Sequence, residues 1–353
     1  MKIIYDNIIY SLQNNGGVSV YWSELLKRVK DDNNVDAYFV DYGDNSRNVM
    51  RKLFELPSDR TRIKNYNHLF TKVNSYVPFY INGSKDVLYH PSYYRYSPHH
   101  LTVNTVHDFI NEKYRKGIPK YINSNQKWQA LNRSDLLICI SKNTKDDLLY
   151  YMPHLKYRQI EVVYHGVSTE FHPIIDSKLS NTFLFIGSRK SYKNFKLAVS
   201  LTKICKEFSL LIIGGGDLTK EEKRLLDCEI RERYSYKRHV DNQELNSIYN
   251  NVFALIYPSS YEGFGMPILE AMKAGCPFVA LNTSSIREIT NNSNILIEPR
   301  PTGELLEQMV QLVEKLKINE IRSDVIADNL ITASKYSWDR CYKETIRSYK
   351  KLL

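Results

Sequence analysis

Several features that mark specialised protein classes are missing or scarce in this chain. Its 353 residues include only five cysteines, dispersed without CxxC spacing. An odd, dispersed set favours reduced and mostly buried thiols over disulfides or a zinc site. The nine histidines are also scattered, and the neighbours His99 and His100 lack the spacing of metal ligands. No Asp-x-Asp pair occurs, so the usual carboxylate pair for a nucleotide-bound divalent metal is missing, and we expect no metal site.

Long hydrophobic runs are absent too. LLICI (136–140) and FALIY (253–257) have the length of strands, and no run approaches the roughly 18 apolar residues that span a bilayer. The opening MKIIYDNIIY reaches Asp6 too early for the apolar core of a signal peptide. We therefore expect a cytoplasmic protein, and leave open a peripheral contact with the inner face of the cytoplasmic membrane.

The bulk composition is that of a globular protein with a basic surface. Hydrophobic residues make up 42% and charged residues 25% of the sequence, which argues against disorder. The net charge of +10 favours an anionic partner: nucleic acid, an anionic membrane surface or a phosphorylated small molecule. A basic surface that serves solubility alone is the plain alternative, and charge does not choose among these.

Strand-like and helix-like segments alternate along the chain. The expected strands are 2–6, 35–41, 86–91, 101–108, 135–141, 160–166, 182–188, 209–216, 252–259, 276–281 and 294–299. The expected helices include 18–30, 120–133, 142–151, 193–208, 219–228, 244–250 and 267–274, and Ser141 is a plausible N-cap.

Such alternation implies parallel sheets covered by helices on both faces. A polar segment with a proline, 168–181, interrupts it. We therefore predict an α/β protein of two doubly wound, Rossmann-like domains, 1–172 and 173–335, that face a cleft. In such folds, ligands bind at the carboxyl ends of the strands.

One basic stretch, 47–72, does not fit the alternation. Its basic residues are Arg47, Arg51, Lys52, Arg60, Arg62, Lys64 and Lys72, and the aromatic residues Tyr66, Phe70 and Tyr76 are close by. Basic residues beside aromatic ones could lie on an anionic membrane surface. A pair of solvated amphipathic helices is the interpretation that we prefer.

The segment SSYEGFGMPILEAMKAG (259–275) combines a glycine turn with a helix. Pro267 stands where the first helical residue is expected, and Gly275 supplies the stop. The free amides at the start of this helix, around 264–266, favour an anion, and the glycines let it approach closely.

Two glutamates accompany this turn. Glu262 lies on the turn, and Glu270 lies about one turn into the helix, so both can face the same pocket. Carboxylates accept hydrogen bonds from hydroxyls, and two of them suit two polyols, such as a sugar and a ribose. A turn residue and an ordinary surface glutamate are the plain alternative.

EGFGMPILEA resembles the E-x7-E motif of the family 4 retaining glycosyltransferases, which have the GT-B fold, and PSSYEGFGMPILEAMKAGCPFVA follows that family's pattern nearly throughout. The resemblance implies that Glu262 lies by the donor sugar and that Glu270 holds the ribose hydroxyls of the nucleotide. It also assigns the intervening turn to the donor site: Gly263, Phe264 and Gly265. Finally, it implies a C-terminal helix, 336–353, that returns to the N-terminal domain.

FIGSRKSYKN (185–194) places cations at the end of another strand. Gly187 ends the strand, and Arg189 and Lys193 follow just beyond it. Two cations there suit a diphosphate, whose negative charge grows as the glycosidic bond breaks. The resemblance likewise implies that Gly187 lies in the donor site and that Arg189 and Lys193 stabilise the leaving group. A solvated basic loop before a helix is the alternative.

The N-terminal half holds weaker signals. Gly16 and Gly17 open its first long helix and resemble the family's glycine loop near the donor phosphate, although a turn without a ligand is also open. His107, in TVHDFI, ends a strand, and the resemblance implies contact with the donor sugar near the reacting carbon. A structural histidine is the alternative. Asp108 would orient His107 or cap the next turn. His165 stands where Asn is commoner in the family.

Residues and resemblance together predict a retaining, metal-independent glycosyltransferase that needs no cofactor. It would move a sugar from a nucleoside diphosphate, with GDP-mannose or a UDP-sugar favoured, to a hydroxyl of a glycan or lipid-linked acceptor. The donor is expected on the C-terminal domain and the acceptor on the N-terminal domain, in the assembly of a surface polysaccharide such as O-antigen or capsule. The expected catalytic residues are His107, Glu262, Arg189 and Lys193.

Three alternatives remain. The first is a non-catalytic protein of the same fold that binds a nucleotide-sugar or a glycan. The second is a GT-B epimerase or phosphorylase. The third is a nucleic-acid binder that uses the basic surface, against which counts the lack of a recognised binding motif.

Overall fold

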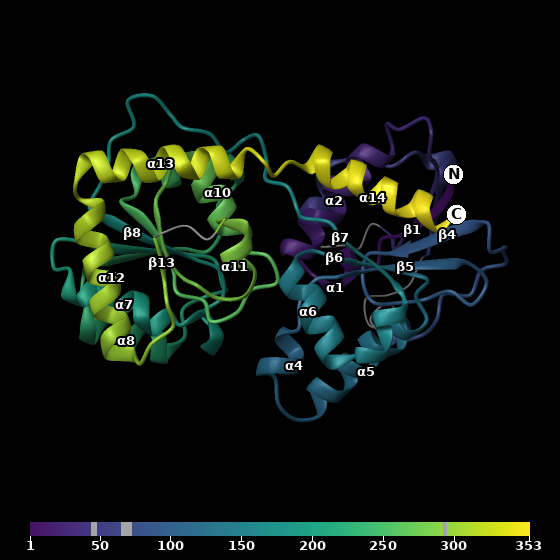
Figure 1. Ribbon diagram of the computed structural model, residues 1–353, viewed down its shortest axis with the longest axis horizontal. Coiled ribbons are helices and arrows are strands. Elements are labelled where there is room, and N and C mark those ends of the chain that lie inside the picture. Colours follow the sequence, from purple (N-terminus) through teal and green to yellow (C-terminus); the bar gives the residue numbers. More distant parts are fainter. Residues whose placement is uncertain (44–47, 65–72, 292–294) are drawn as a thin grey trace. The chain divides into compact units, whose positions relative to one another are not determined.

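The computed structural model describes residues 1–43, 48–64, 73–291 and 295–353. The chain divides into two compact units (Figure 1). The first unit contains residues 1–166 and 338–353, and the second contains 167–337. The division therefore falls a few residues before the expected boundary between 172 and 173. Within the described residues, no helix combines the length and apolarity needed to cross a membrane.

The first unit is built on a parallel sheet in the order β3-β2-β1-β4-β5-β6-β7. Its strands are β1 (Lys2–Asp6), β2 (Asp36–Asp41), β3 (Thr61–Ile63), β4 (Val87–Pro91), β5 (Leu101–Val106), β6 (Leu136–Cys139) and β7 (Gln159–Val162). Every residue of β4 and β6 is buried, as expected for strands covered on both faces.

Helices cover both faces of this sheet. They are α1 (Ile9–Leu12), α2 (Gly17–Val29), α4 (Ile110–Tyr114), α5 (Ile118–Asn132), α6 (Lys142–Tyr151) and α14 (Trp338–Leu352), with 3-10 turns η1 (Met50–Leu53), η2 (Ser58–Arg60) and η3 (Pro153–Tyr157). In Figure 1, α2 and α14 lie on one side of the sheet, and α4, α5 and α6 lie on the other. Ser141 caps α6 as predicted, because its side chain accepts the N–H of Thr144.

The C-terminal helix α14 belongs to the first unit, which confirms the predicted return. Polar contacts join it to that unit, among them the ion pair of Lys351 with Glu161 at 2.7 Å. The hydroxyl of Tyr349 lies 2.5 Å from Nδ1 of His90. Arg28 pairs with Asp339 at 2.7 Å, and the Tyr342 hydroxyl donates to Asp32 at 2.8 Å.

The basic stretch 47–72 is only partly described. Arg47, Tyr66, Phe70 and Lys72 lie outside the described residues. In 48–64 the chain forms η1, η2 and the edge strand β3, so the preferred pair of amphipathic helices is wrong for that part. The sequence TRI is too short to show a strand period, and the pairing with β2 creates the strand.

The second unit repeats the plan with a sheet in the order β10-β9-β8-β11-β12-β13. Its strands are β8 (Thr182–Ile186), β9 (Ser209–Ile213), β10 (Tyr234–Lys237), β11 (Ala254–Tyr257), β12 (Phe278–Leu281) and β13 (Leu296–Ile297). The strands β11 and β12 are buried throughout. The alternation missed β10, because the strand is polar and lies at the sheet edge.

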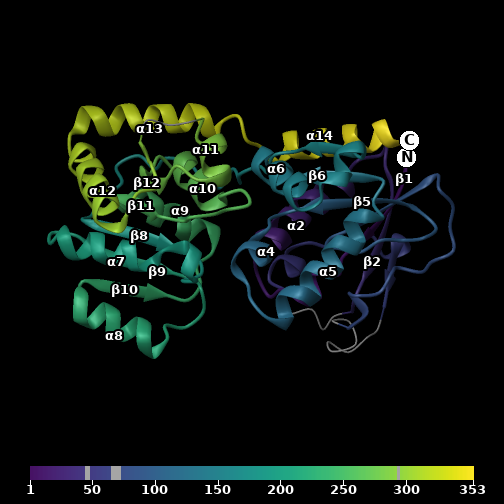
Figure 2. The same cartoon turned by 60° about the horizontal axis from the view of Figure 1, so that its bottom comes forward.

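The helices of the second unit are η4 (Ser191–Lys193, a 3-10 turn), α7 (Phe195–Ile204), α8 (Lys220–Glu229), α9 (Asn242–Asn251), α10 (Met266–Ala274), α11 (Ser284–Ile289), α12 (Thr302–Leu316) and α13 (Asn319–Ala333). The main core joins β8, β9 and β11 to residues of α7 and α12. The helices α10 and α13 lie on the opposite side of the sheet from α7 and α8, as Figures 1 and 2 show.

Both sheets therefore have a topological switch point. The order of connection reverses between β1 and β4 in the first unit and between β8 and β11 in the second. In open parallel sheets, the loops after the two strands at such a point form the ligand crevice. A ligand is therefore expected to bind at one or both of the two switch points.

Candidate active site

The switch point of the second unit brings together a lysine and a glutamate from separate loops. Lys193 ends the 3-10 turn that follows β8, and Glu262 lies in the loop after β11. The Lys193 ammonium donates to Glu262 Oε1 at 2.5 Å and to the Tyr257 hydroxyl at 3.1 Å. The side chains are 12% and 9% exposed, so water only partly screens the pair.

The glycine turn around Glu262 is held by two serines at the start of α11. The Glu262 N–H donates to Ser284 Oγ at 2.9 Å. The Ser285 hydroxyl donates to the carbonyls of Glu262 (2.9 Å) and Phe264 (2.8 Å). These bonds fix the backbone of the turn and leave the Glu262 carboxylate to Lys193. No spacing rule would have found the two serines, because their partners are backbone groups far away in sequence.

Gly265 makes the sharp entry into α10 possible. Its φ of +104° lies in the region that favours glycine, and an added Cβ would lie 3.0 Å from Cδ1 of Ile289. Pro267 occupies the first turn of α10 as predicted, and Gly275 ends the helix in the left-handed conformation.

Glu270 lies on α10, one turn after the helix starts. The Tyr249 hydroxyl lies 3.1 Å from its Oε2 and 3.2 Å from the Pro267 carbonyl oxygen. Burial raises the pKa of Glu270 to about 7, and the hydrogen bond from Tyr249 opposes that rise. A carboxyl with this pKa changes its charge near neutral pH, which is uncommon for a structural surface glutamate.

Arg189 is engaged with its own surroundings. Its Nη1 donates to the Gly214 carbonyl at 2.7 Å, and its Nη2 donates to the carbonyls of Gly216 (2.8 Å) and Asp217 (3.0 Å). Its Nε lies 2.9 Å from Oε1 of Glu222, and the side chain is only 3% exposed. In this structure, Arg189 therefore clamps the loop after β9, and its role on a diphosphate stays a prediction. Gly187, expected in the donor site, follows β8 and has a φ of +108°.

The first unit places its predicted residues at the carboxyl ends of β1 and β5. Gly16 is the N-cap of α2, and the helix begins at Gly17, so unpaired amides of the first turn lie there. His107 follows β5 and is buried. Burial lowers the pKa of His107 to about 3, so the imidazole is neutral. Asp108 caps the turn before α4, since its Oδ1 accepts the Ile110 N–H at 3.0 Å.

Two aromatic rings lie close to the His107 ring. The Tyr21 ring lies 5.5 Å from it, and the His165 ring lies 6.1 Å away. Tyr21 and His165 lie 4.6 Å apart, so the unusual His165 packs beside His107. Burial also lowers the pKa of His165 well below its ordinary value. No motif in the sequence indicated that these rings are neighbours.

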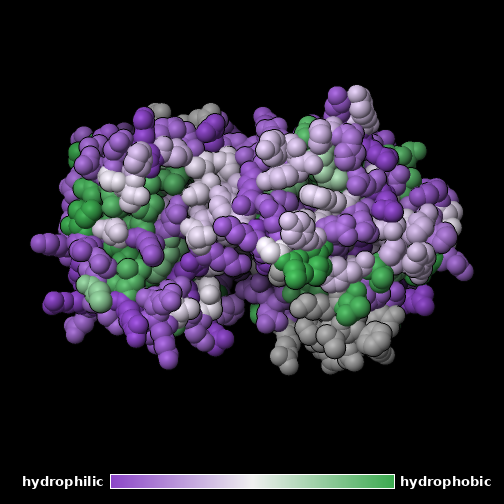
Figure 3. Space-filling model, turned by 90° about the horizontal axis from the view of Figure 1, so that it is seen from below, coloured by the Kyte–Doolittle hydropathy of each residue, from purple (hydrophilic) through white to green (hydrophobic). Residues whose placement is uncertain are grey.

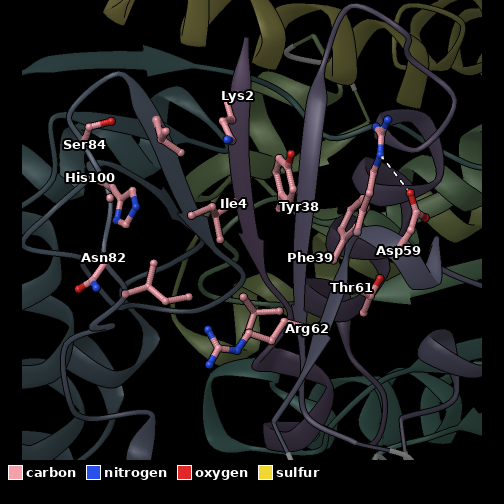
Figure 4. A pocket seen from close by; sticks show the side chains of 15 residues that line it. Lys2, Ile4, Tyr38, Phe39, Asp59, Thr61, Arg62, Asn82, Ser84 and His100 are labelled. Atoms are coloured by element: carbon pink, nitrogen blue, oxygen red, sulfur yellow. Dashed lines mark ion pairs between the residues drawn. The ribbon is translucent and has the colours of Figure 1, made fainter.

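A hollow of about 430 Å³ in the first unit lies away from these residues. Figure 4 shows Lys2, Ile4 and Tyr38 among the residues that line it. The lining runs along β1 and β2, from Lys2 at the amino end of β1 to Val40, which pairs with Asp6 at its carboxyl end. None of the predicted site residues lines this hollow. Over the described ranges, no three His, Cys, Asp or Glu side chains are grouped to hold a metal ion.

The match to a known family falls in the second unit, which holds Lys193, Glu262 and Glu270. Residues 168–328 match the family model described as glycosyl transferases group 1. The chain is 25% identical to the O-antigen chain mannosyltransferase B of Escherichia coli, over 100% of both chains. It is 24% identical to an uncharacterized glycosyltransferase of Methanocaldococcus jannaschii, over 100% of this chain and 99% of the relative.

Solved structures share the fold. The sucrose-phosphate synthase of Thermosynechococcus elongatus has a TM-score of 0.73 at 16% identity and covers 100% of this chain and 99% of its own. The Anabaena HepE protein in complex with UDP-glucose has a TM-score of 0.72 at 14% identity, with 99% and 100% covered. The predicted fold class is confirmed, because two α/β units with parallel sheets match GT-B structures. The match to group 1 glycosyl transferases lies within the second unit, and the likeness to the solved structures extends over both units.

Proposed function

We propose that the protein is a retaining, metal-independent glycosyltransferase of family 4 that transfers mannose from a nucleoside diphosphate to a hydroxyl of a growing surface polysaccharide, such as an O-antigen. The ion pair between Lys193 and Glu262 at the switch point of the second unit carries this proposal. The choice of mannose rests on the E. coli O-antigen mannosyltransferase to which the chain is similar. GDP-mannose is the donor that we expect first, and a UDP-sugar is the second choice.

Lys193 is equipped to hold the diphosphate. An ammonium group has three N–H donors, and two of them point to Glu262 and Tyr257. The third can bond a phosphate oxygen without breaking either contact. In this low-exposure site, the charge gains strength as the leaving diphosphate becomes more negative.

The two glutamates divide the polyols of the donor between them. Glu262 keeps acceptor positions beyond the one used by Lys193, and these suit hydroxyls of the sugar. Glu270 accepts the ribose hydroxyls when it is ionised. The amides at the start of α10, after Gly265, favour the anionic part of the donor.

The reaction then needs no group of the protein as a nucleophile. The acceptor hydroxyl forms a bond to the anomeric carbon on the face from which the diphosphate departs, and its proton passes to a diphosphate oxygen. The electron pair of the broken bond leaves with the diphosphate, next to Lys193. The acceptor and the neutral His107 are assigned to the first unit, where His107 can exchange hydrogen bonds with sugar hydroxyls without carrying a charge.

The proposal is tested first by binding. Thermal stabilisation of the wild type and of Glu270→Ala is measured with UDP, GDP, ADP and CDP. We expect GDP to raise the melting temperature of the wild type and to lose most of that effect in the variant. The preferred nucleotide then selects the labelled sugar donor for transfer assays, which should run equally well in EDTA.

Three results would overturn the proposal. Stabilisation by none of the four nucleotides at millimolar concentration removes the donor site. Binding without transfer to any glycan or lipid-linked acceptor indicates a non-catalytic binding protein. Release of a sugar phosphate in the presence of inorganic phosphate, or rearrangement of the donor alone, indicates a phosphorylase or an epimerase.

A further inference from the structure

The first unit carries a group of exposed apolar side chains where α4 meets α5. We call this group the α4–α5 patch, and it consists of Val73, Tyr76, Val77, Tyr114, Ile118, Tyr121 and Ile122. Ile118 is 74% exposed and Ile122 is 49% exposed, one helical turn apart. Exposed apolar groups of this extent mark an interaction surface in many soluble proteins.

The patch is built on firmly held backbone. Gln126 of α5 donates to the Ser75 carbonyl at 2.7 Å, and this bond is buried. The Tyr76 hydroxyl donates to Asn123 of α5 at 3.4 Å. The segment 73–77 is therefore fastened along α5, so its exposed side chains and those of the helix form one surface.

The charges beside the patch have a single sign. Between residues 113 and 122 the charged residues are Lys113, Arg115, Lys116 and Lys120, without an acidic one. Lys113 pairs with Asp147 at 2.6 Å. Over the described part of the chain, no ion pair involves Arg115, Lys116 or Lys120. The adjacent Glu112 is buried and bonds the equally buried Lys127 at 3.1 Å, so it does not neutralise them.

The second unit offers an informative contrast. Ile204 and Ile318 are each 51% exposed, and Figure 3 shows apolar colour on both units. There, however, Lys317 is bonded at 2.6 Å to both Glu207 and Glu314. Its apolar surface is therefore bordered by paired charges, which give no net attraction to an anion.

We propose that the α4–α5 patch docks on the surface of a membrane rich in anionic phospholipids. Isoleucine and tyrosine side chains can enter the boundary between headgroups and acyl chains, while Arg115, Lys116 and Lys120 face the lipid phosphates. A protein partner would need a complementary acidic surface, whereas an anionic membrane supplies both the apolar layer and the negative charge. This docking proposal rests on the proposed function only for the reason to dock: an enzyme that uses a lipid-linked acceptor meets that acceptor at a membrane.

The patch is mechanically joined to a predicted site residue of the same unit. Lys127 lies on α5, the helix that also carries Ile118 and Ile122. Its ammonium donates to the Asp108 carbonyl at 2.5 Å. Asp108 directly follows His107. Docking through α5 would therefore fix on the membrane the unit to which we assign the acceptor.

The test is vesicle flotation of the full chain. Phosphatidylcholine vesicles with and without phosphatidylglycerol are compared for the wild type, for Ile118→Ser/Ile122→Ser, and for Ile204→Ser/Ile318→Ser as the matched control. We expect wild type and control to float with the anionic vesicles and to bind neutral vesicles at least about tenfold more weakly, with binding lost as salt is raised. The patch variant should lose at least about tenfold in partitioning, because two aliphatic side chains no longer enter the bilayer.

Several results would overturn the proposal: failure of the wild type to float with anionic vesicles, equal binding to neutral ones, or equal loss in patch and control variants. A dimer in ultracentrifugation that only the patch variant abolishes, without vesicle binding, would make the patch a contact between copies. Nucleotide-induced stabilisation of the same variants separates the two proposals. Vesicle binding without nucleotide binding supports the docking surface and refutes the proposed function. Nucleotide binding without vesicle binding supports the proposed function and refutes the docking surface.

Discussion

The two switch points have the same topology and opposite contents. In the first unit, Asp6 ends β1 and forms an ion pair with Arg95 at 2.6 Å. The hydroxyl of Tyr89 also donates to Asp6, at 2.5 Å, and Arg95 donates to the Tyr42 hydroxyl at 2.7 Å. The two charged side chains are 0% and 1% exposed. In the second unit, Lys193 and Glu262 retain some exposure and unused hydrogen-bonding capacity.

The difference shows that the strand order creates a crevice at each switch point but does not determine whether a ligand binds there. A fully buried ion pair fills the switch point of the first unit, whereas a partly exposed pair leaves the other switch point available to a ligand. Charge alone does not separate the two cases, because each has one cation and one carboxylate. Solvent exposure separates them, since the side chains of the first pair are at most 1% exposed and those of the second are 12% and 9% exposed.

The largest expected effect is on the stability of the first unit. Arg95→Met leaves Asp6 buried without its cation, which should cost about 3–5 kcal/mol. Hydrogen exchange followed by mass spectrometry should show faster exchange in β1 and β4 and no change in β8 and β11. Asp6→Leu/Arg95→Met is the control, because removing both charges should restore most of the stability. A loss below about 1 kcal/mol in the single variant would contradict a structural role.

The matching change in the second unit should act on catalysis. Glu262→Gln keeps the shape and removes the charge that faces Lys193, so transfer should slow about 10²- to 10³-fold, while exchange in β8 and β11 stays unchanged. The rate is measured as release of the nucleoside diphosphate from the donor that binds. Glu232→Gln, at an exposed site of the same unit, is the control and should keep the full rate. Near-normal transfer by Glu262→Gln would place this pair with the structural one.

A third prediction concerns pH and Glu270. Its pKa of about 7 means that the ionised form grows about tenfold between pH 6 and pH 8, and affinity for a nucleotide-sugar should rise by about that factor. A nucleotide-sugar is the suitable probe because its diphosphate does not titrate in this range. Calorimetry of wild type and Glu270→Gln gives the comparison, and the variant should bind weakly with no such rise.

The same pKa has a consequence for stability with the opposite sign. A carboxyl whose pKa is raised on folding favours the folded state below its ordinary pKa of 4.5, and that contribution is lost as pH rises through about 7. Glu270→Gln should therefore flatten the fall of the melting temperature between these values.

An affinity for nucleotide-sugar that is independent of pH in the wild type would remove Glu270 from the ribose site.

How much the sequence could predict follows from where the information lies. Continuous apolar runs predicted β8 and β11, and the cap at Ser141 fixed the start of α6. The strands β3 and β10 were missed, because short polar edge strands show no period. The α4–α5 patch could not be predicted either, since exposure depends on which residues of α5 the fold buries. The family match stops at residue 328 and leaves the first unit without such support.

Arg189 shows the limit of prediction within the site. Its place after β8 predicted a diphosphate ligand, but its N–H groups donate to carbonyls of residues 214–217. No sequence pattern placed these carbonyls beside it. Contact depends on the parallel pairing of β8 with β9 and on the left-handed turns at Gly214, Gly215 and Gly216. At Gly215 an added Cβ would come within 2.5 Å of the Gly187 carbonyl oxygen, so the loop packs tightly against the chain after β8.

The smallest expected effect on nucleotide affinity therefore comes from Arg189→Lys. Lysine keeps the positive charge but cannot reach several carbonyls with one planar fork, so the variant should lose about 1–3 kcal/mol of stability. Its nucleotide affinity should fall only a fewfold, because the loop after β9 loosens while Lys193 and Glu262 remain in place. Chemical denaturation and calorimetry with a nucleoside diphosphate and its nucleoside distinguish this from direct binding. Unchanged stability with a loss of more than about 100-fold for the diphosphate alone would show that Arg189 leaves its carbonyls to bind the phosphates, since a clamp that acts through the loop would weaken both ligands together.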